Sequence, residues 1–175
     1  ESHQVRVYDI STGANGGGGG GGGGGSRLVC KMGREGGEGG VGEGEFHYPC
    51  GVVVTADSST MIIADCRNDR LVVLSLAVSD DGTTAALAFV RHIGGGGQLD
   101  RPSGLALRSV GSSQTVLVAE DDGCGVSEWT IDGTKIRTIG TGNQGSGDGD
   151  LSLPRDVTVL PVSGHIAVAD TSNHR

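Results

Sequence analysis

The sequence predicts an all-β fold in which small antiparallel sheets stack radially on one another. No window carries a sustained 3.6-residue apolar stripe, which an amphipathic helix would need. Glycine is 35 of 175 residues, and each glycine in a helix interior costs roughly 1 kcal/mol relative to alanine. Runs such as Val52–Val54 and Leu71–Leu74 are apolar on consecutive positions, so both faces of these strands need cover. Neighbouring sheets on either side would supply that cover.

A unit of about 50 residues recurs along the chain, which is the signature of a repeat architecture. Each copy opens on a proline: Pro49, Pro102 and Pro154. An apolar strand follows, then a polar turn, then a second apolar strand that closes on a small residue and an acidic one. Third and fourth strands complete the unit, and the fourth ends at an Ile-Gly or Met-Gly step. The unit therefore has four strands with glycine and proline between copies.

In chain order, the spacing predicts two complete units between two halves. Residues 1–32 hold the last two strands of an earlier unit, interrupted by a glycine-rich insertion at 13–26. Residues 46–93 form the first complete unit, and residues 99–140 form a second, degenerate one. Residues 151–175 supply the first half of a further unit. The uninterrupted glycine run inside the insertion cannot bury apolar surface, so we expect a flexible loop there.

Each second strand leads into a turn that carries the most specific signal. The first complete unit has Asp65, Asn68 and Arg70, and the last has Asp170, Asn173 and Arg175, whereas the middle unit has an acid but neither Asn nor Arg. This pattern resembles the NHL repeat. The resemblance implies a partial β-propeller of four-stranded antiparallel blades, two complete blades flanked by two half blades. The repeat motif comprises Pro49, Gly51, Asp65, Asn68, Arg70, Pro102, Gly104, Glu120, Pro154, Asp170, Asn173 and Arg175.

The acidic and basic residues of this motif have a structural interpretation. Asp65 and Asn68 are turn formers whose side chains can bond nearby backbone N–H groups. Arg70 can reach carboxylates or carbonyls of the same or the adjoining blade. We therefore expect these residues to hold the blade together and assign none of them to catalysis.

Other motifs do not predict a cofactor or a metal. Gly140–Gly145 spells GxGxxG, but no helix can start after it, and dinucleotide binding needs that helix. Asp148 and Asp150 lack the rest of a calcium loop. The histidines His3, His47, His92, His165 and His174 are dispersed. Among the predicted innermost strands, only Asp156 offers an acidic side chain, so no catalytic constellation is visible.

Charge and cysteine content limit the classes of partner and ligand that we expect. The net charge of −8 disfavours binding to nucleic acid, whose phosphates are neutralised by Lys and Arg. The four cysteines, Cys30, Cys50, Cys66 and Cys124, have no metal-ligand spacing, which favours small buried or loop cysteines. No run is long enough to span a bilayer. The sequence does not determine the subcellular location of the protein, and we favour the cytoplasm.

The leading functional hypothesis is a non-enzymatic protein-interaction scaffold. In NHL-containing proteins the propeller selects a partner while other domains act, for instance a ubiquitin-ligase module; this is what the resemblance implies. We expect blade loops to contact the partner, and the variable ones are Gly33–Glu45, Ser79–Thr84 and Gly140–Asp150. We also expect further blades of a longer chain to complete the ring. Two alternatives stay open: a propeller hydrolase or lyase with a metal in the central channel, and an RNA-binding NHL domain.

Overall fold

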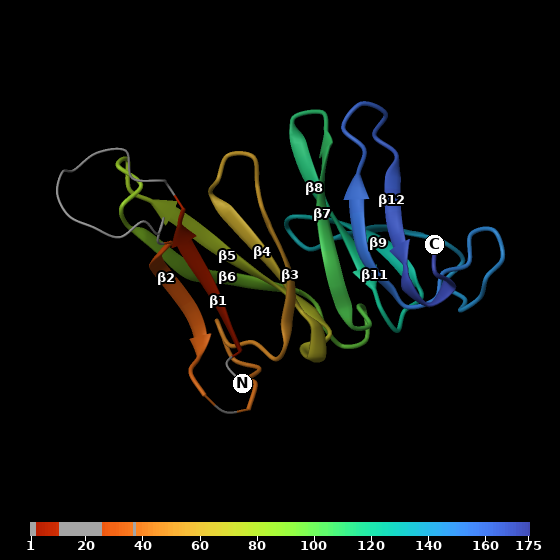
Figure 1. The fold of residues 1–175 in the computed structure, drawn as a ribbon, viewed down its shortest axis with the longest axis horizontal. Coiled ribbons are helices and arrows are strands. Elements are labelled where there is room, and N and C mark those ends of the chain that lie inside the picture. Colours follow the sequence, from red (N-terminus) through yellow and green to blue (C-terminus); the bar gives the residue numbers. More distant parts are fainter. Residues whose placement is uncertain (1–2, 11–25, 37) are drawn as a thin grey trace, which may run out of the picture.

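The computed structural model describes residues 3–10, 26–36 and 38–175. Within these ranges the regular structure is almost entirely β-strand, arranged in four antiparallel sheets, two of which have four strands (Figure 1). The remaining regular elements are two short 3-10 turns, η1 (Cys66–Asn68) and η2 (Thr171–Asn173). The predicted all-β class with four-stranded antiparallel sheets is therefore confirmed. The insertion predicted at 13–26 lies, apart from Ser26, outside the described residues.

The four sheets follow one another along the chain. The N-terminal half-blade consists of β1 (His3–Asp9) and β2 (Arg27–Arg34). Blade 1 consists of β3 (Pro49–Val54), β4 (Thr60–Asp65), β5 (Arg70–Val78) and β6 (Ala85–Gly94). Blade 2 consists of β7 (Pro102–Val110), β8 (Ser113–Glu120), β9 (Gly125–Thr130) and β10 (Lys135–Ile139). The C-terminal half-blade consists of β11 (Pro154–Val159) and β12 (Ile166–Asp170).

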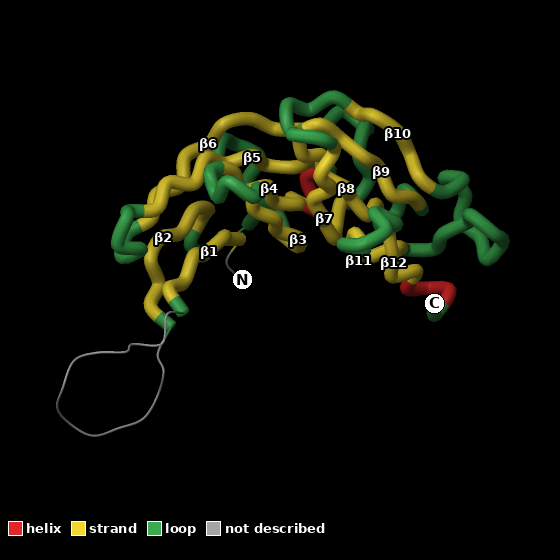
Figure 2. Tube along the Cα trace, turned by 90° about the horizontal axis from the view of Figure 1, so that it is seen from above, coloured by secondary structure: helices red, strands yellow, loops and turns green. Residues whose placement is uncertain are grey.

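The sheets form an arch with the first strand of each unit on the inside. Figure 2 shows β3, β7 and β11 along the concave side, whereas β6 and β10 lie on the convex side. The inner strands meet backbone to backbone, which explains two glycines of the repeat. A Cβ on Gly51 would come within 2.3 Å of the Ser103 carbonyl oxygen, and a Cβ on Gly104 within 2.7 Å of the Arg155 carbonyl oxygen.

Apolar side chains fill the spaces between successive sheets. One cluster lies between the N-terminal half-blade and blade 1, a second between blades 1 and 2, and a third between blade 2 and the C-terminal half-blade. Phe46 and Trp129 are the largest buried side chains. Burial between sheets is the main source of stability, because each sheet alone would leave apolar faces in water. Among the described residues, no helix has the length and apolar character needed to cross a membrane.

One apolar run is less covered than the sequence predicts. Leu71–Leu74 in β5 are at most 2% exposed, as expected for a strand buried on both faces. In β3, however, Val52 is 55% exposed and Val54 is 38% exposed. The expectation of cover on both faces is therefore wrong for β3. The reason is that the N-terminal half-blade has only two described strands, and these pack farther out on blade 1, against β4 and β5.

Candidate functional site

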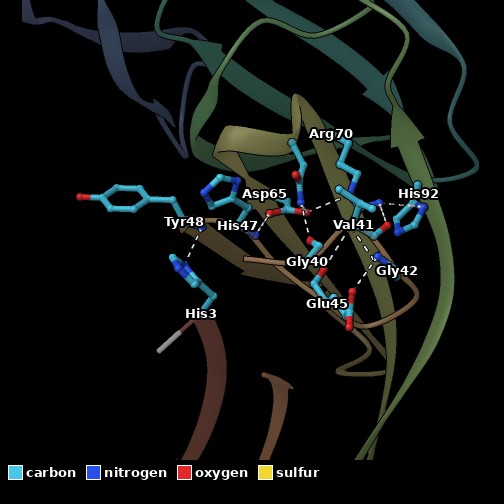
Figure 3. A network of polar contacts seen from close by, with 11 residues as sticks. His3, Gly40, Val41, Gly42, Glu45, His47, Tyr48, Asp65, Arg70 and His92 are labelled. Carbon is cyan, nitrogen blue, oxygen red and sulfur yellow. Dashed lines mark hydrogen bonds and ion pairs between the residues drawn. The ribbon is translucent and has the colours of Figure 1, made fainter. Parts of the chain in front are cut away.

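The turn after β4 is organised around the fully buried carboxylate of Asp65 (Figure 3). One of its oxygens accepts a hydrogen bond from the His47 backbone N–H at 2.6 Å. The other accepts from the Asn68 side-chain amide at 2.8 Å and from Nε of Arg70 at 2.8 Å. The η1 turn ends at Asp69 with φ of 50°, which returns the chain so that Arg70 can face Asp65. Every oxygen of this buried charge is thus satisfied.

The remaining donors of Arg70 bind the glycine-rich segment that precedes the blade. They donate to the backbone carbonyls of Val41 at 2.6 Å and Glu45 at 3.1 Å, and more weakly to that of Gly42 at 3.4 Å. Figure 3 shows this segment curled around the guanidinium group. The planar group with several donors suits such a ring of carbonyls. The network therefore fixes a loop that its glycine content alone would leave free.

The last copy repeats this network contact for contact. Asp170 accepts from the Ser152 N–H at 2.7 Å, from Asn173 at 2.8 Å and from Nε of Arg175 at 2.8 Å. Burial raises the pKa of Asp170, but the hydrogen bonds from Asn173, Ser152 and Arg175 outweigh it and leave that pKa lowered. Arg175 also donates to backbone carbonyls of the preceding glycine-rich loop: those of Ser146, Gly147 and Asp150.

The middle copy keeps only one part of this network. Glu120 accepts from the Asp100 backbone N–H at 3.0 Å, which corresponds to the bond between Asp65 and His47. Gly125 stands at the position of Arg70, so the guanidinium group that binds the preceding loop in the other two copies has no counterpart at this position. Nearby, Arg101 forms ion pairs with Asp122 at 3.0 Å and Asp121 at 3.6 Å. Hydrogen bonding and charge from Asp122 raise the pKa of Arg101.

The three prolines of the motif start the innermost strands, and the residue before each has an unusual backbone. Tyr48, Arg101 and Leu153 have φ values of 62°, 47° and 49°, a region that side chains with a Cβ rarely occupy. At two of these three positions, a hydrogen bond to a neighbouring sheet stabilises the unusual backbone. The Tyr48 N–H donates to Nδ1 of His3 at 3.0 Å, and the Arg101 N–H donates to the Asp69 carboxylate at 2.9 Å.

These positions form one surface, which we call the proline face. It consists of the residues that flank the three prolines: Tyr48, Cys50, Arg101, Ser103, Leu153 and Arg155. A cavity of about 390 Å³ opens between the starts of β3, β7 and β11, and it is lined by Cys50, Gly51, Ser103, Gly104, Arg155 and Asp156. The backbone is equivalent at each copy while the side chains are aromatic, charged, aliphatic or small.

Two cysteines come together at this face, which sequence spacing did not indicate. Burial and the adjacent Cys66 thiol raise the pKa of Cys50 to about 11. Cys66 is the first residue of η1 and Cys50 the second residue of β3. The pairing of β3 with β4 brings the two cysteines close together. Their positions within the repeat unit are therefore the sequence feature from which this contact could have been predicted.

The three loops expected to bind a partner lie in different settings. Arg70 binds carbonyls of Gly33–Glu45, and Arg175 binds carbonyls of Gly140–Asp150. Ser79–Thr84 is the hairpin turn between β5 and β6. Asp81 closes it, and hydrogen bonds from Ser79 and Thr83 lower the pKa of this carboxyl to about 2. Two of the three loops are thus held by the repeat networks.

The described residues do not gather a metal-binding group. Nowhere in the described ranges do three or more His, Cys, Asp or Glu side chains come together in an arrangement that could hold a metal ion. Asp156 lines the cavity and accepts a hydrogen bond from the Val157 N–H at 2.9 Å. His92 lies 3.5 Å from Arg70, and burial together with the Arg70 charge lowers its pKa.

Comparison with known families identifies one repeat directly. The profile of the NHL repeat matches residues 151–175, the segment that carries Asp170, Asn173 and Arg175. The resemblance to the NHL repeat is thereby confirmed for this copy. Among curated proteins, no sequence matches the chain significantly.

Solved structures support the same fold. An auxiliary nutrient binding protein from Bacteroides ovatus ATCC 8483 superposes with a TM-score of 0.54 and 14% identity, over 71% of this chain and 35% of its own. A functionally unknown protein from Desulfotomaculum acetoxidans DSM 771 superposes with a TM-score of 0.53 and 14% identity, over 95% of this chain and 39% of its own. The chain thus spans under two fifths of either structure. At this identity the likeness concerns the fold alone.

Proposed function

We propose that this chain is a non-enzymatic scaffold that binds a protein partner through the proline face. The observation that carries the proposal is the contrast between fixed backbone and variable side chains on that face. Three equivalent positions with positive φ carry Tyr48, Arg101 and Leu153. A strained backbone persists only where the surroundings hold it firmly, and hydrogen bonds to a neighbouring sheet hold two of these three positions, Tyr48 and Arg101.

The exposed groups on this face suit protein recognition. Tyr48 is 50% exposed and the Arg67 guanidinium group lies 5.1 Å from its ring centroid. The Arg155 side chain is 63% exposed. Tyr and Arg are enriched among the residues that dominate binding energy at protein interfaces. Rigid presentation also lowers the entropic cost of association. Together these features favour a docking surface.

The proposal is tested by comparing which proteins bind to each of two matched variants of the chain. In the first, Tyr48→Ala, Arg101→Glu and Arg155→Glu change the proline face. In the second, Val78→Ala, Arg91→Glu and Lys135→Glu change exposed residues on β5, β6 and β10. We expect a protein that binds the unchanged chain and the second variant, and that loses most of its affinity for the first.

Quantitative binding of that protein would then be measured by isothermal titration calorimetry. A reduction of at least tenfold in affinity is expected for the first variant, because removal of a central anchor residue costs about 2 kcal/mol or more. Equal losses for both variants would contradict the assignment of the proline face. Circular dichroism of each variant confirms that the sheets are retained.

A further inference from the structure

Two free cysteines on the proline face lie where two segments of blade 1 meet. Cys50 is exposed and is the second residue of β3, whereas Cys66 is buried and opens the η1 turn after β4. The residues just before them, Pro49 and Asp65, lie opposite each other in the sheet. The start of β3 also contacts η1. Strand pairing therefore holds the two cysteines beside each other.

An irregularity in β3 turns Cys50 toward the same side of the sheet as Cys66. Two residues of β3, Cys50 and Gly51, stand opposite the single residue Ala64 of β4. This two-against-one arrangement is a β-bulge, which changes the direction of side chains. Ala64 packs in the cluster between blades 1 and 2, and Cys66 follows it by two residues, which is the spacing of one face of a strand. Both thiols therefore lie on the side of blade 1 that faces blade 2.

The two thiols interact directly, and a cation of blade 2 lies beside them. A hydrogen bond joins the Cys50 and Cys66 side chains. The guanidinium group of Arg101 donates another to Cys66, and its charge also acts on the Cys50 thiol. Cys50 lines the cavity of about 390 Å³ at the proline face. One thiol of the pair is thus accessible from solvent, and the other lies behind it.

Two thiols in contact, one of them accessible, meet the requirements for thiol–disulfide exchange. We propose that Cys50 and Cys66 are a redox modification site that forms a reversible disulfide bond by exchange with a small-molecule disulfide such as oxidised glutathione. The proposal depends on the strand pairing, the bulge and the contact between the thiols. It does not depend on whether the proline face binds a partner.

The exchange takes place in two balanced steps. In the first, Cys50 gives up its proton and its thiolate attacks one sulfur of the small disulfide, whose S–S bond breaks; one small thiolate leaves and takes up a proton. In the second, the deprotonated Cys66 attacks the Cys50 sulfur of the mixed disulfide, and the second small thiolate leaves and is protonated. The two cysteines have then lost two electrons and two protons, which the small disulfide has gained as two thiols.

The accessible thiol is a slow nucleophile. Burial and the neighbouring Cys66 raise the pKa of Cys50 to about 11, so this thiol is protonated at neutral pH. Since the thiolate is the attacking species, we expect the first step to limit the rate. The bond should therefore be measured at equilibrium.

The disulfide would join the two segments that present an aromatic and a cationic side chain. Tyr48 precedes Cys50 by two residues, and Arg67 directly follows Cys66. The Arg67 guanidinium carbon lies 5.1 Å from the Tyr48 ring centroid. A cross-link here closes the loop that contains the β3–β4 hairpin and restricts the unfolded chain. Oxidation should therefore raise the midpoint of thermal unfolding.

The test uses the double variant Cys30→Ser/Cys124→Ser, in which Cys50 and Cys66 are the two remaining thiols. The reduced chain is equilibrated with mixtures of reduced and oxidised glutathione, alkylated and measured by mass spectrometry. Cleavage before Asp57, which lies between the two cysteines, shows whether their peptides stay linked. We expect a linked species whose mass, before alkylation, is lower than that of the reduced chain by two hydrogen atoms.

The same titration in urea concentrated enough to unfold the chain is the matched control. Because the fold brings the thiols together, the equilibrium constant for linkage should be about tenfold or more higher in the folded chain. An equal constant in urea would overturn the proposal. Glutathione adducts without linkage, or disulfide bonds between two chains in place of the internal bond, would overturn it as well.

Single substitutions in the same background test the order of the two steps. Cys66→Ser should accumulate a mixed disulfide of glutathione with Cys50, because the second thiol is missing. Cys50→Ser should leave Cys66 mostly reduced, because Cys66 is 4% exposed. Equal adducts on both variants would contradict the entry of the oxidant at Cys50. The double variant keeps both cysteines, so the main test does not depend on how either single variant folds.

Discussion

Blades 1 and 2 stabilise their buried carboxylates in different ways. In blade 1 the buried carboxylate is Asp65, in the turn after the second strand, where Asn68 and Arg70 surround it. In blade 2 the corresponding turn has lost both partners. A second buried carboxylate instead lies in the third strand: Glu128, whose side chain is 2% exposed.

Glu128 is satisfied by groups from three other strands. Thr115 donates at 2.7 Å, Arg108 at 3.0 Å and Nε of Arg137 at 2.6 Å. The network of blade 1 ties a loop to a turn, whereas that of blade 2 ties strands within a sheet. The comparison teaches that the repeat sequence can degenerate at the turn when another buried network stabilises the blade.

The largest effect is expected from Arg70→Ala. This change leaves the fully buried Asp65 charge without its cation and frees three loop carbonyls. Breaking a buried ion pair by removing one partner costs about 3–5 kcal/mol. The free energy of unfolding, measured by urea denaturation, should fall by that amount. Arg175→Ala is the control, because Arg175 is 46% exposed; an equal loss for both would contradict the role of burial.

A smaller, pH-dependent effect is expected from Glu128→Gln. Burial raises the pKa of Glu128, but hydrogen bonds from Thr115, Arg137 and Arg108 outweigh it and leave that pKa lowered. A lowered folded-state pKa stabilises the fold above the unfolded value of about 4.3 and loses this contribution as the pH falls through the folded-state pKa.

At pH 7 the substitution should therefore cost about 2 kcal/mol, the scale of hydrogen bonds to a charged group. The difference between the unchanged chain and the variant should shrink as the pH is lowered below about 4. Urea denaturation at several pH values measures it. Glu38→Gln, which changes an exposed carboxyl, is the matched control. A constant difference for Glu128→Gln at all pH values would argue against the charge as the cause.

Much of this comparison follows from the sequence, but not all of it. The strand positions and the turn residues Asp65, Asn68 and Arg70 are readable because they recur at a fixed period. The carbonyl partners of Arg70 are not, since glycines carry no side-chain signal. One hint exists: the two copies with Arg have the long bridges Gly40–Gly44 and Gly145–Gly149, and the copy without Arg has a shorter bridge.

Other features depend on three-dimensional neighbours that no repeat pattern specifies. Glu128 stands between a serine and a tryptophan in the sequence. The two cations that pair with it, Arg108 and Arg137, come from β7 and β10. Val52 belongs to an apolar run, but its exposure depends on which strand faces it. The adjacency of Cys50 and Cys66 likewise arises from strand pairing. The role of a side chain was predictable where its partners lie in the same turn of the repeat. It was not predictable where the partners come from several strands.

The smallest effect is expected from Gly51→Ala, which tests how closely blades 1 and 2 approach each other. The added Cβ would lie 2.3 Å from the Ser103 carbonyl oxygen, so β3 and β7 must move apart. Overpacking of this kind costs about 1–2 kcal/mol when neighbours can shift. Gly125→Ala is the matched control, because its Cβ would come no closer than 3.4 Å to a neighbour. Thermal unfolding of both variants should show a loss of stability for Gly51→Ala alone, and equal stability would mean that the inner strands tolerate separation.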